Sequence, residues 1–175
     1  MIQKSSELKV LEVFFKEPTN IHFIREIGRK IKLAPTSVKN NVKELLKMEL
    51  ILEKRSKPFD GYIANRDNEN FQFYKRMANI TDVKNSGLLD SLINSIHPYA
   101  IILYGSYLKG EDVETSDIDL LIISKAKKEI DLKKFENILK RKIHVIINQD
   151  LKKLPKNLRE EIINGFVLYG YLKNG

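Results

Sequence analysis

The chain has 175 residues, so it can form one ordinary domain or two small ones. It has no cysteine, which excludes a disulfide framework and a thiolate metal site. No apolar run reaches the about 18 residues of a membrane-spanning helix, and the first residues lack a signal-peptide pattern, so we expect a cytoplasmic protein with no membrane partner. The net charge is +8, and residues 1–80 carry +6 of it, with 16 Lys and Arg against 10 Asp and Glu, which favours a polyanionic partner for the N-terminal half.

The first 66 residues have the pattern of three helices followed by a hairpin. Apolar side chains recur at helical spacing after Ser5 and Ser6, either of which can cap the first helix. Pro35 suits the first turn of the third helix. The predicted elements are helices over 5–16, 21–31 and 35–50, strands over 51–55 and 62–64, and a turn at Pro58 and Gly61.

This order of elements resembles a winged helix-turn-helix domain, which we assign to residues 1–66. The resemblance implies that the third helix enters the DNA major groove and that the hairpin touches the phosphate backbone. The side chains that would reach DNA are Thr36, Ser37, Lys39, Asn40, Lys43, Lys54, Arg55 and Lys57. Winged helices also serve as dimerisation or docking modules, so a homodimer stays open beside a DNA complex.

Two helices, predicted over residues 67–79 and 81–96, link this domain to the rest of the chain. Thr81 or Asp82 can cap the second of them. The apolar side of the first is formed by Phe71, Tyr74 and Met77. We interpret this stripe as core rather than as a base-stacking surface, because an aromatic stripe at helical spacing is more typical of a core.

Two carboxylates open the second of two apolar runs in the C-terminal half. The runs, over residues 100–104 and 118–123, are predicted as neighbouring buried strands. Asp117 and Asp119 are two residues apart, so on a strand both side chains leave the same face. Hard oxygen donors favour Mg²⁺ or Mn²⁺, which take their remaining ligands from phosphates. The pair therefore predicts a metal site for a polyphosphate substrate.

The bend after the first run supplies the other half of the predicted site. Gly105 and Ser106 form a turn between a strand end and a predicted helix start, where backbone N–H groups bind phosphate. Ser106 can add a hydroxyl donor, and Gly110 allows a close approach of the backbone.

The order Gly105-Ser106, Gly110, then Ser116-Asp117-Ile118-Asp119, within residues 100–125, resembles the signature of the polymerase-β-like nucleotidyltransferase superfamily, most closely its minimal nucleotidyltransferases. The resemblance implies an NTP substrate and an in-line displacement in which pyrophosphate leaves. It also implies that Asp117 and Asp119 hold the catalytic Mg²⁺. The nucleotide-binding residues that it implies are Gly105, Ser106, Gly110 and Ser116.

The remaining residues complete a small α/β unit over 97–175 with a mixed sheet, so the whole chain is expected to be an α+β protein. Its further predicted elements are a helix over 131–141, a strand over 142–148, a helix over 157–163 and an apolar segment over 166–169.

One position departs from the superfamily pattern. Many members carry a third acidic residue on the strand that follows the intervening helix, whereas this chain has His144 at the position expected to face the site. Three hypotheses remain open: His144 serves as the catalytic base, Glu136 or Asp150 folds into the site instead, or catalysis is lost while nucleotide binding persists.

Two functions follow from these patterns. The first is an Mg²⁺-dependent nucleotidyltransferase with a DNA-binding winged helix, and the alternative is a transcriptional regulator that senses nucleotides with a degenerate transferase fold. Superfamily members include antitoxins that adenylylate a toxin and enzymes that modify aminoglycosides, so the resemblance leaves the acceptor open among a partner protein, a nucleic acid and a small molecule.

Overall fold

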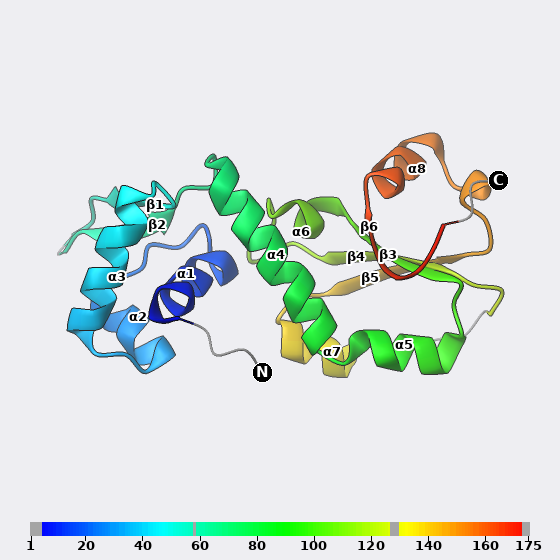
Figure 1. The fold of residues 1–175 in the computed structure, drawn as a ribbon, viewed down its shortest axis with the longest axis horizontal. Helices are drawn as coiled ribbons and strands as arrows, with labels where there is room; N and C mark the ends of the chain where they lie inside the picture. The colour runs from blue at the N-terminus through cyan, green and yellow to red at the C-terminus, as the bar shows by residue number, and fades with distance from the viewer. Residues whose placement is uncertain (1–4, 58, 127–129, 173–175) are drawn as a thin grey trace. The chain divides into compact units, whose positions relative to one another are not determined.

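The computed structural model describes residues 5–57, 59–126 and 130–172. The chain divides into two compact units, residues 1–78 and 79–175 (Figure 1). Pro58, part of the predicted hairpin turn, lies outside the described residues. Of the helices in the described part of the chain, none is both long and apolar enough to cross a membrane.

The first unit contains the three helices and the antiparallel hairpin that the sequence predicts. Their bounds are α1 (Ser6–Lys16), α2 (Ile24–Ile31), α3 (Pro35–Lys47), β1 (Ile51–Lys54) and β2 (Gly61–Ala64). Ser5 caps α1, because its hydroxyl accepts the N–H of Leu8 at 3.2 Å. Helix α2 begins later than predicted because His22 is extended and forms a backbone bridge to Tyr62. The elements close around a core that includes Phe14, Ile27, Val38, Leu45 and Ile51.

The helices between the hairpin and the sheet differ from the prediction. Helix α4 (Glu69–Asn85) runs on where a break near residue 80 was expected, and α5 (Leu88–Ile96) follows it. Gly87 makes the turn between them with φ +79°, a conformation that glycine adopts without steric cost. The expected caps at Thr81 and Asp82 are therefore wrong, since both residues lie inside α4.

The apolar stripe of α4 is only partly a core stripe. Phe71 is buried in the first unit and packs edge-on against Phe15, with ring centroids 5.2 Å apart. Tyr74 and Met77 are exposed. The core interpretation is thus confirmed for Phe71 and wrong for the other two residues. The last turns of the same helix contribute Val83 to the core of the second unit.

The second unit contains a four-stranded mixed sheet, as predicted. Its strands are β3 (Ala100–Tyr104), β4 (Ile118–Ile123), β5 (Ile143–Asn148) and β6 (Phe166–Gly170), in the order β5-β4-β3-β6. Strand β3 is antiparallel to both neighbours, and β4 is parallel to β5. The other elements are α6 (Gly105–Lys109), α7 (Lys133–Leu139), the 3₁₀ turn η1 (Leu151–Lys153) and α8 (Lys156–Ile163).

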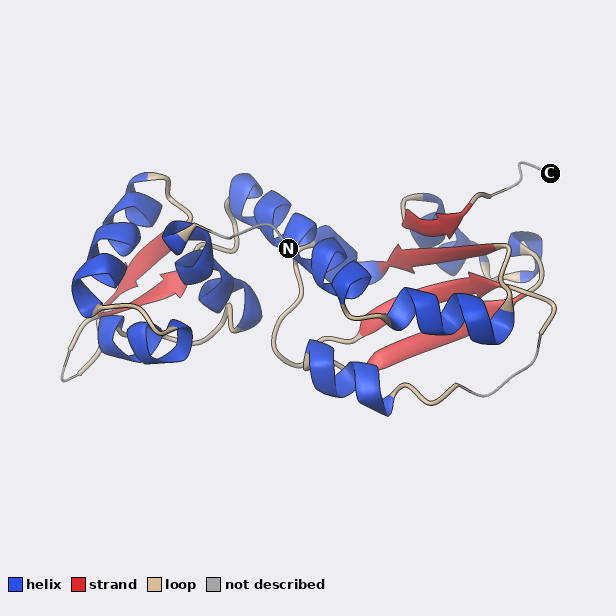
Figure 2. Ribbon diagram, turned by 60° about the horizontal axis from the view of Figure 1, so that its bottom comes forward, coloured by secondary structure: helices blue, strands red, loops and turns tan. Residues whose placement is uncertain are grey.

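Helices cover both faces of this sheet (Figure 2). On one face, Ile101 and Leu103 share a core with residues of α5 and with Phe135 of α7. On the other face, Ile102 packs with Ile162 of α8. Successive side chains of a strand point to opposite faces. Because Leu121 lies in the core on the α8 side, Asp119, two residues earlier, points to that side as well.

Candidate active site

Strand pairing surrounds Asp119 with two specific neighbours. Asp119 is the second residue of β4, and it lies opposite Tyr104 on β3 and His144 on β5. Asp117 directly precedes the strand and is exposed. The two aspartates therefore lie at the N-terminal end of β4, beside the point where β3 ends and α6 begins.

The Gly105 bend brings the main chain against the Asp119 carboxylate. Gly105 has φ +76°, and a Cβ atom placed there would lie 2.6 Å from Oδ2 of Asp119. Any side chain at this position would displace the carboxylate or the bend. Helix α6 starts at the bend, so its first N–H groups, which have no intrahelical acceptors, lie beside an acidic side chain. Ser106, in that first turn, is half-buried, and Gly110 ends the helix with φ +77°.

Burial and neighbouring charges disfavour the ionised form of Asp119. Its side chain is 27% exposed, and burial is the main cause that raises its pKa above 3.8. A contact of 3.3 Å between Nδ1 of His144 and Oδ1 of Asp119 acts in the opposite direction, while the charges of Asp117 and Glu161 raise the pKa further. Burial, with the charges of Asp119 and Glu161, also raises the pKa of Tyr104 to about 12.

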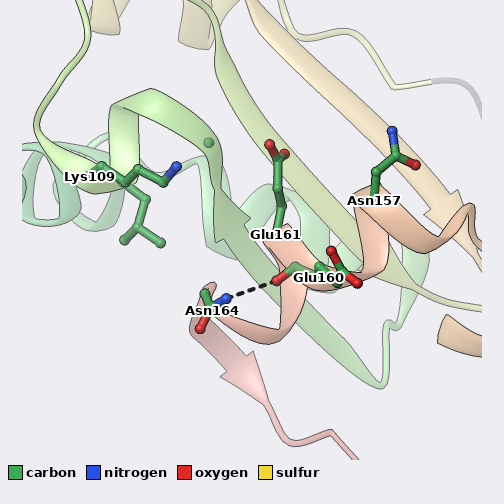
Figure 3. A pocket seen from close by; sticks show the side chains of 7 residues that line it. Lys109, Asn157, Glu160, Glu161 and Asn164 are labelled. Carbon is green, nitrogen blue, oxygen red and sulfur yellow. Dashed lines mark hydrogen bonds between the residues drawn. The ribbon is translucent and has the colours of Figure 1, made fainter.

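Glu161 is an acidic residue of this site that the sequence reasoning missed. It belongs to α8, which packs over the face that holds Asp119, and it lines a cleft of about 360 Å³ together with Gly105, Lys109 and Asn157 (Figure 3). Figure 3 shows Glu161 and Lys109 projecting into this cleft from different helices. The volume is in the range of small-molecule sites. The local sequence of α8 gave no signal, because Glu160 and Glu161 read only as polar residues of an amphipathic helix.

The two other carboxylates considered from the sequence make different contacts. Glu136 accepts the N–H of Ile143 at 3.1 Å, at the start of β5. Asp150 accepts the N–H of Lys152 at 2.9 Å and caps η1. Neither carboxylate contributes to the raised pKa of Asp119, whereas Glu161 does.

Ser116 has a local structural contact. Its hydroxyl accepts the N–H of Val113 at 3.0 Å, and its own N–H donates to the carbonyl of Val113 at 3.0 Å. These bonds close the turn that leads to Asp117. The structure thus gives Ser116 a role in holding the loop, in addition to the nucleotide contact expected from the sequence.

A buried polar cluster of Asn79, Asp112 and Arg141 supports the segment that connects β3 to β4. Asp112 is 1% exposed, and its Oδ1 accepts the side-chain amide of Asn79 at 2.8 Å. The same amide donates to the carbonyl of Tyr107 at 2.8 Å, and the guanidinium of Arg141 lies 3.6 Å from Asp112. Buried charges are stable when they are paired and hydrogen-bonded in this way. The cluster ties α4 and α6 to the loop that carries Asp117.

The acidic side chains of the site are spaced more widely than the ligands of one ion. Among the described residues, Asp117, Asp119 and Glu161 do not bring three ligand atoms within 4.8 Å of one another. A cation bound between them would draw them together, and it would remove the repulsion that raises the pKa of Asp119.

The expected DNA-contacting residues belong to the first unit and are all exposed. The buried side of α3 consists of Val38, Val42 and Leu45, so Lys39 and Lys43, four residues apart, lie together on its outer surface. The other exposed members of the set are Thr36, Ser37, Asn40, Lys54, Arg55 and Lys57.

Comparisons with known proteins bear on the second unit. Residues 88–169, from the start of α5 to the last strand, match the model of the nucleotidyltransferase domain family. This match confirms the nucleotidyltransferase resemblance for these residues. The search of curated proteins found no match. A mutant of Lactococcus lactis ZitR is similar in structure, with 17% identity, a TM-score of 0.39, and coverage of 54% of this chain and 67% of that chain. The winged-helix resemblance of residues 1–66 stays a prediction.

Proposed function

We propose that this protein is a divalent-metal-dependent nucleotidyltransferase that moves a nucleoside monophosphate from an NTP to a hydroxyl acceptor. The observation that carries the proposal is the contact between the Gly105 bend and the Asp119 carboxylate in a domain of the nucleotidyltransferase family. It brings the bend that we expect to bind phosphate beside a carboxylate, and transfer from a triphosphate requires both groups in one site.

The donor set fits a hard cation such as Mg²⁺ or Mn²⁺. Asp117, Asp119 and Glu161 offer carboxylate oxygens, and the charges of Asp117 and Glu161 add to the effect of burial in raising the pKa of Asp119. When bound, the ion stabilises negative charge on the transferring phosphoryl group. The three carboxylates would hold the ion, and the N–H groups at the Gly105 bend with the Ser106 hydroxyl would hold the triphosphate.

The proton of the acceptor must also have a destination. As the acceptor oxygen forms its bond to the α-phosphorus, the bond from that phosphorus to the leaving pyrophosphate breaks, and the hydroxyl proton is released. The imidazole of His144 touches Asp119 and is 60% exposed, so it can take this proton at the mouth of the site. Lys109, in the same cleft, can balance charge on the pyrophosphate.

Incubation of the purified protein with each α-labelled NTP, with Mg²⁺, with Mn²⁺ or with EDTA, tests the proposal. We expect metal-dependent nucleotide binding, and label transfer once a protein, nucleic acid or aminoglycoside acceptor is supplied. If the acceptor is a toxin-like partner protein, that protein will carry the label after the reaction. If no NTP binds with either metal, the transferase proposal is wrong and the nucleotide-sensing alternative is lost with it.

Glu161→Gln is expected to lower the transfer rate about 10²-fold, because it removes one of the three charges proposed to hold the ion. It should also lower the pKa of Asp119, since the charge of Glu161 contributes to raising it. Rate measurements and an NMR titration of the carboxyl carbons provide the two readouts.

Glu160→Gln is the matched control for that variant. Glu160 is the preceding residue of α8 and lines the same cleft, but its carboxylate lies 3.9 Å from the ammonium of Lys156, and its charge is not among the causes that raise the pKa of Asp119. Equal rates for the two variants would exclude Glu161 from the metal site.

The surface of α3 favours a second function, DNA binding by the first unit. Because the contacts we propose are phosphate contacts by lysine, affinity for duplex DNA should fall steeply as salt rises. Lys39→Glu combined with Lys43→Glu should lower the affinity at least about tenfold and make its salt dependence shallower, as a fluorescence anisotropy titration would measure.

The control for charge alone is Lys133→Glu combined with Lys134→Glu on α7, which changes the net charge equally in the other unit. If the two double variants lower the DNA affinity equally, the attraction is a non-specific one between DNA and a basic protein. Affinity that responds to neither would remove the DNA-binding proposal.

A further inference from the structure

A buried histidine in the first unit has a fixed tautomer. His22 is fully buried between α1 and α2, with the ring of Phe14 packed edge-on against it at 5.0 Å. Its Nε2 lies 2.9 Å from the carbonyl oxygen of Glu17. A carbonyl oxygen can only accept, so Nε2 must carry the hydrogen. In the neutral ring, Nδ1 therefore presents a lone pair.

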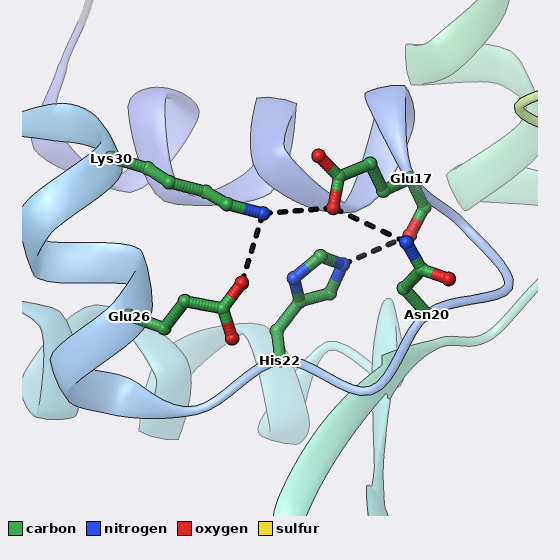
Figure 4. A network of polar contacts seen from close by, with 5 residues as sticks. All are labelled: Glu17, Asn20, His22, Glu26 and Lys30. Carbon is green, nitrogen blue, oxygen red and sulfur yellow. Dashed lines mark hydrogen bonds and ion pairs between the residues drawn. The ribbon is translucent and has the colours of Figure 1, made fainter.

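That lone pair has no hydrogen-bond donor. Nδ1 of His22 is a buried atom without a partner among the described residues, which is a costly state for a polar group. Figure 4 shows this nitrogen on the side of the ring that faces Glu26 and Lys30. A histidine whose second nitrogen donates to a backbone carbonyl is the usual arrangement of a metal ligand, because that bond orients the ring.

Two carboxylates complete a potential ligand set. Glu17, His22 and Glu26 each place a ligand atom within 4.8 Å of the other two. The carboxylates are 37% and 33% exposed, so the set has a buried nitrogen on one side and access to water on the other. An ion can enter from solvent and retain water as a further ligand.

A cation already occupies the space between the carboxylates. The ammonium of Lys30 lies 2.8 Å from Oε2 of Glu17 and 2.9 Å from Oε1 of Glu26. Its hydrogen bond is the main cause that lowers the pKa of Glu17. Burial opposes the charge on Lys30, but the bonds to both carboxylates outweigh it and raise the pKa of the ammonium. The two carboxylates therefore stabilise a positive charge between them. The ammonium that now supplies this charge is at the end of a long, partly exposed lysine side chain.

We propose that Nδ1 of His22 and the carboxylates of Glu17 and Glu26 form a binding site for a divalent transition-metal ion of the Zn²⁺ class, from which the Lys30 ammonium is displaced. One imidazole with two carboxylates is a ligand set that suits Zn²⁺ better than Mg²⁺. At Zn–ligand distances of about 2.0–2.2 Å the ligand atoms must approach by roughly 1 Å, which side-chain rotation can provide.

A bound ion would brace the junction between the helices and the hairpin. The backbone of His22 exchanges two hydrogen bonds with Tyr62 of β2, both 2.8 Å long. Fixing the His22 ring therefore fixes the position where α2 begins beside the hairpin. This site lies wholly within residues 1–78 and does not depend on the proposed transferase function.

Zn²⁺ titration of the full chain by calorimetry, with Co²⁺ as a spectroscopic probe of the ligand set, tests the proposal. The titration is repeated in Asp119→Asn, so that any ion bound in the second unit is counted separately. We expect a single Zn²⁺ that persists in Asp119→Asn and that raises the midpoint of thermal unfolding. No Zn²⁺ binding, or binding that is lost only in Asp119→Asn, would overturn the proposal.

Two variants with opposite expected effects locate the ion. Glu26→Gln should weaken Zn²⁺ binding at least tenfold because it removes a ligand, whereas Lys30→Gln should strengthen it because it removes the competing ammonium. Glu44→Gln is the control, since Glu44 pairs with Lys47 at 2.7 Å on α3 and is not among the described residues whose ligand atoms lie within 4.8 Å of one another. Affinities that stay unchanged in both Glu26→Gln and Lys30→Gln would place the ion elsewhere and reject the site.

Discussion

Replacing Asp119 by Asn is expected to lower nucleotidyl transfer by about 10³-fold or more without unfolding the protein. The amide keeps the size of the carboxylate but loses the charge that would hold the ion, and charge stabilisation of several kcal/mol corresponds to such a factor. The fold should tolerate the change because burial already disfavours the ionised side chain. Transfer of labelled nucleotide and a thermal melt measure the two effects.

Comparing the pH dependence of the unchanged protein with that of Asp119→Asn gives an independent check, because only the carboxyl group titrates. Because the pKa of Asp119 is raised, protons compete with the metal at a higher pH than at an ordinary aspartate of pKa 3.8. The folded state then binds the proton more tightly than the unfolded state, so this group adds stability below its unfolded pKa, and the gain is lost as pH rises through the folded pKa. As pH falls, this contribution to stability therefore increases, whereas the affinity for the metal decreases.

The control is Asp131→Asn, whose carboxylate accepts the N–H of Lys133 at the start of α7. It should transfer nucleotide at the rate of the unchanged protein. Transfer by Asp119→Asn at that same rate would contradict the proposed site, whatever the melts show.

The parts of the site that the sequence predicts are those formed by neighbouring residues. The two apolar runs end where they were expected to end, whereas Asp117, which was expected on the second strand with Asp119, lies directly before β4. The contact between Gly105 and Asp119 depends only on the pairing of adjacent strands. Short-range periodicity was therefore sufficient to predict the mixed sheet and the neighbouring positions of Gly105 and Asp119.

Glu161 could not be predicted in this way, because its position depends on tertiary packing. It reaches the site only because α8 lies on the sheet face where Ile162 packs against Ile102, and the helical pattern of α8 does not reveal which sheet face it covers. The same holds for His22, whose burial and bond to the carbonyl of Glu17 arise from the closure of α1 on α2. A residue brought in by another element leaves no local signature.

The continuous helix α4 was missed for a related reason. Thr81 and Asp82 are poor helix formers and good caps, so a boundary was predicted there. In the structure the amide of Asn79 finds acceptors on Tyr107 and Asp112 instead of on its own backbone. A long-range polar bond thus overrides the local preference, and the chain turns at Gly87.

Gly105→Ala is expected to lower transfer about 10²-fold, more than its effect on stability would explain. At φ +76° an alanine costs about 1–2 kcal/mol of backbone strain. In addition, its Cβ would lie 2.6 Å from Oδ2 of Asp119, whose other oxygen is fixed by His144, so the carboxylate must rotate away. A displacement of about 1 Å in a catalytic group is enough for a 10²-fold loss.

Gly87→Ala separates the two causes. Gly87 has φ +79°, so alanine suffers the same backbone strain, but among the described residues no atom other than those of adjacent residues lies within 4 Å of its Cβ position. Both variants should therefore lower the unfolding midpoint by a similar amount, while only Gly105→Ala should lose transfer activity. Because the strain is matched, equal activity in the two variants would mean that the Gly105 bend and the Asp119 carboxylate do not act on the same nucleotide, even though they touch in the folded protein.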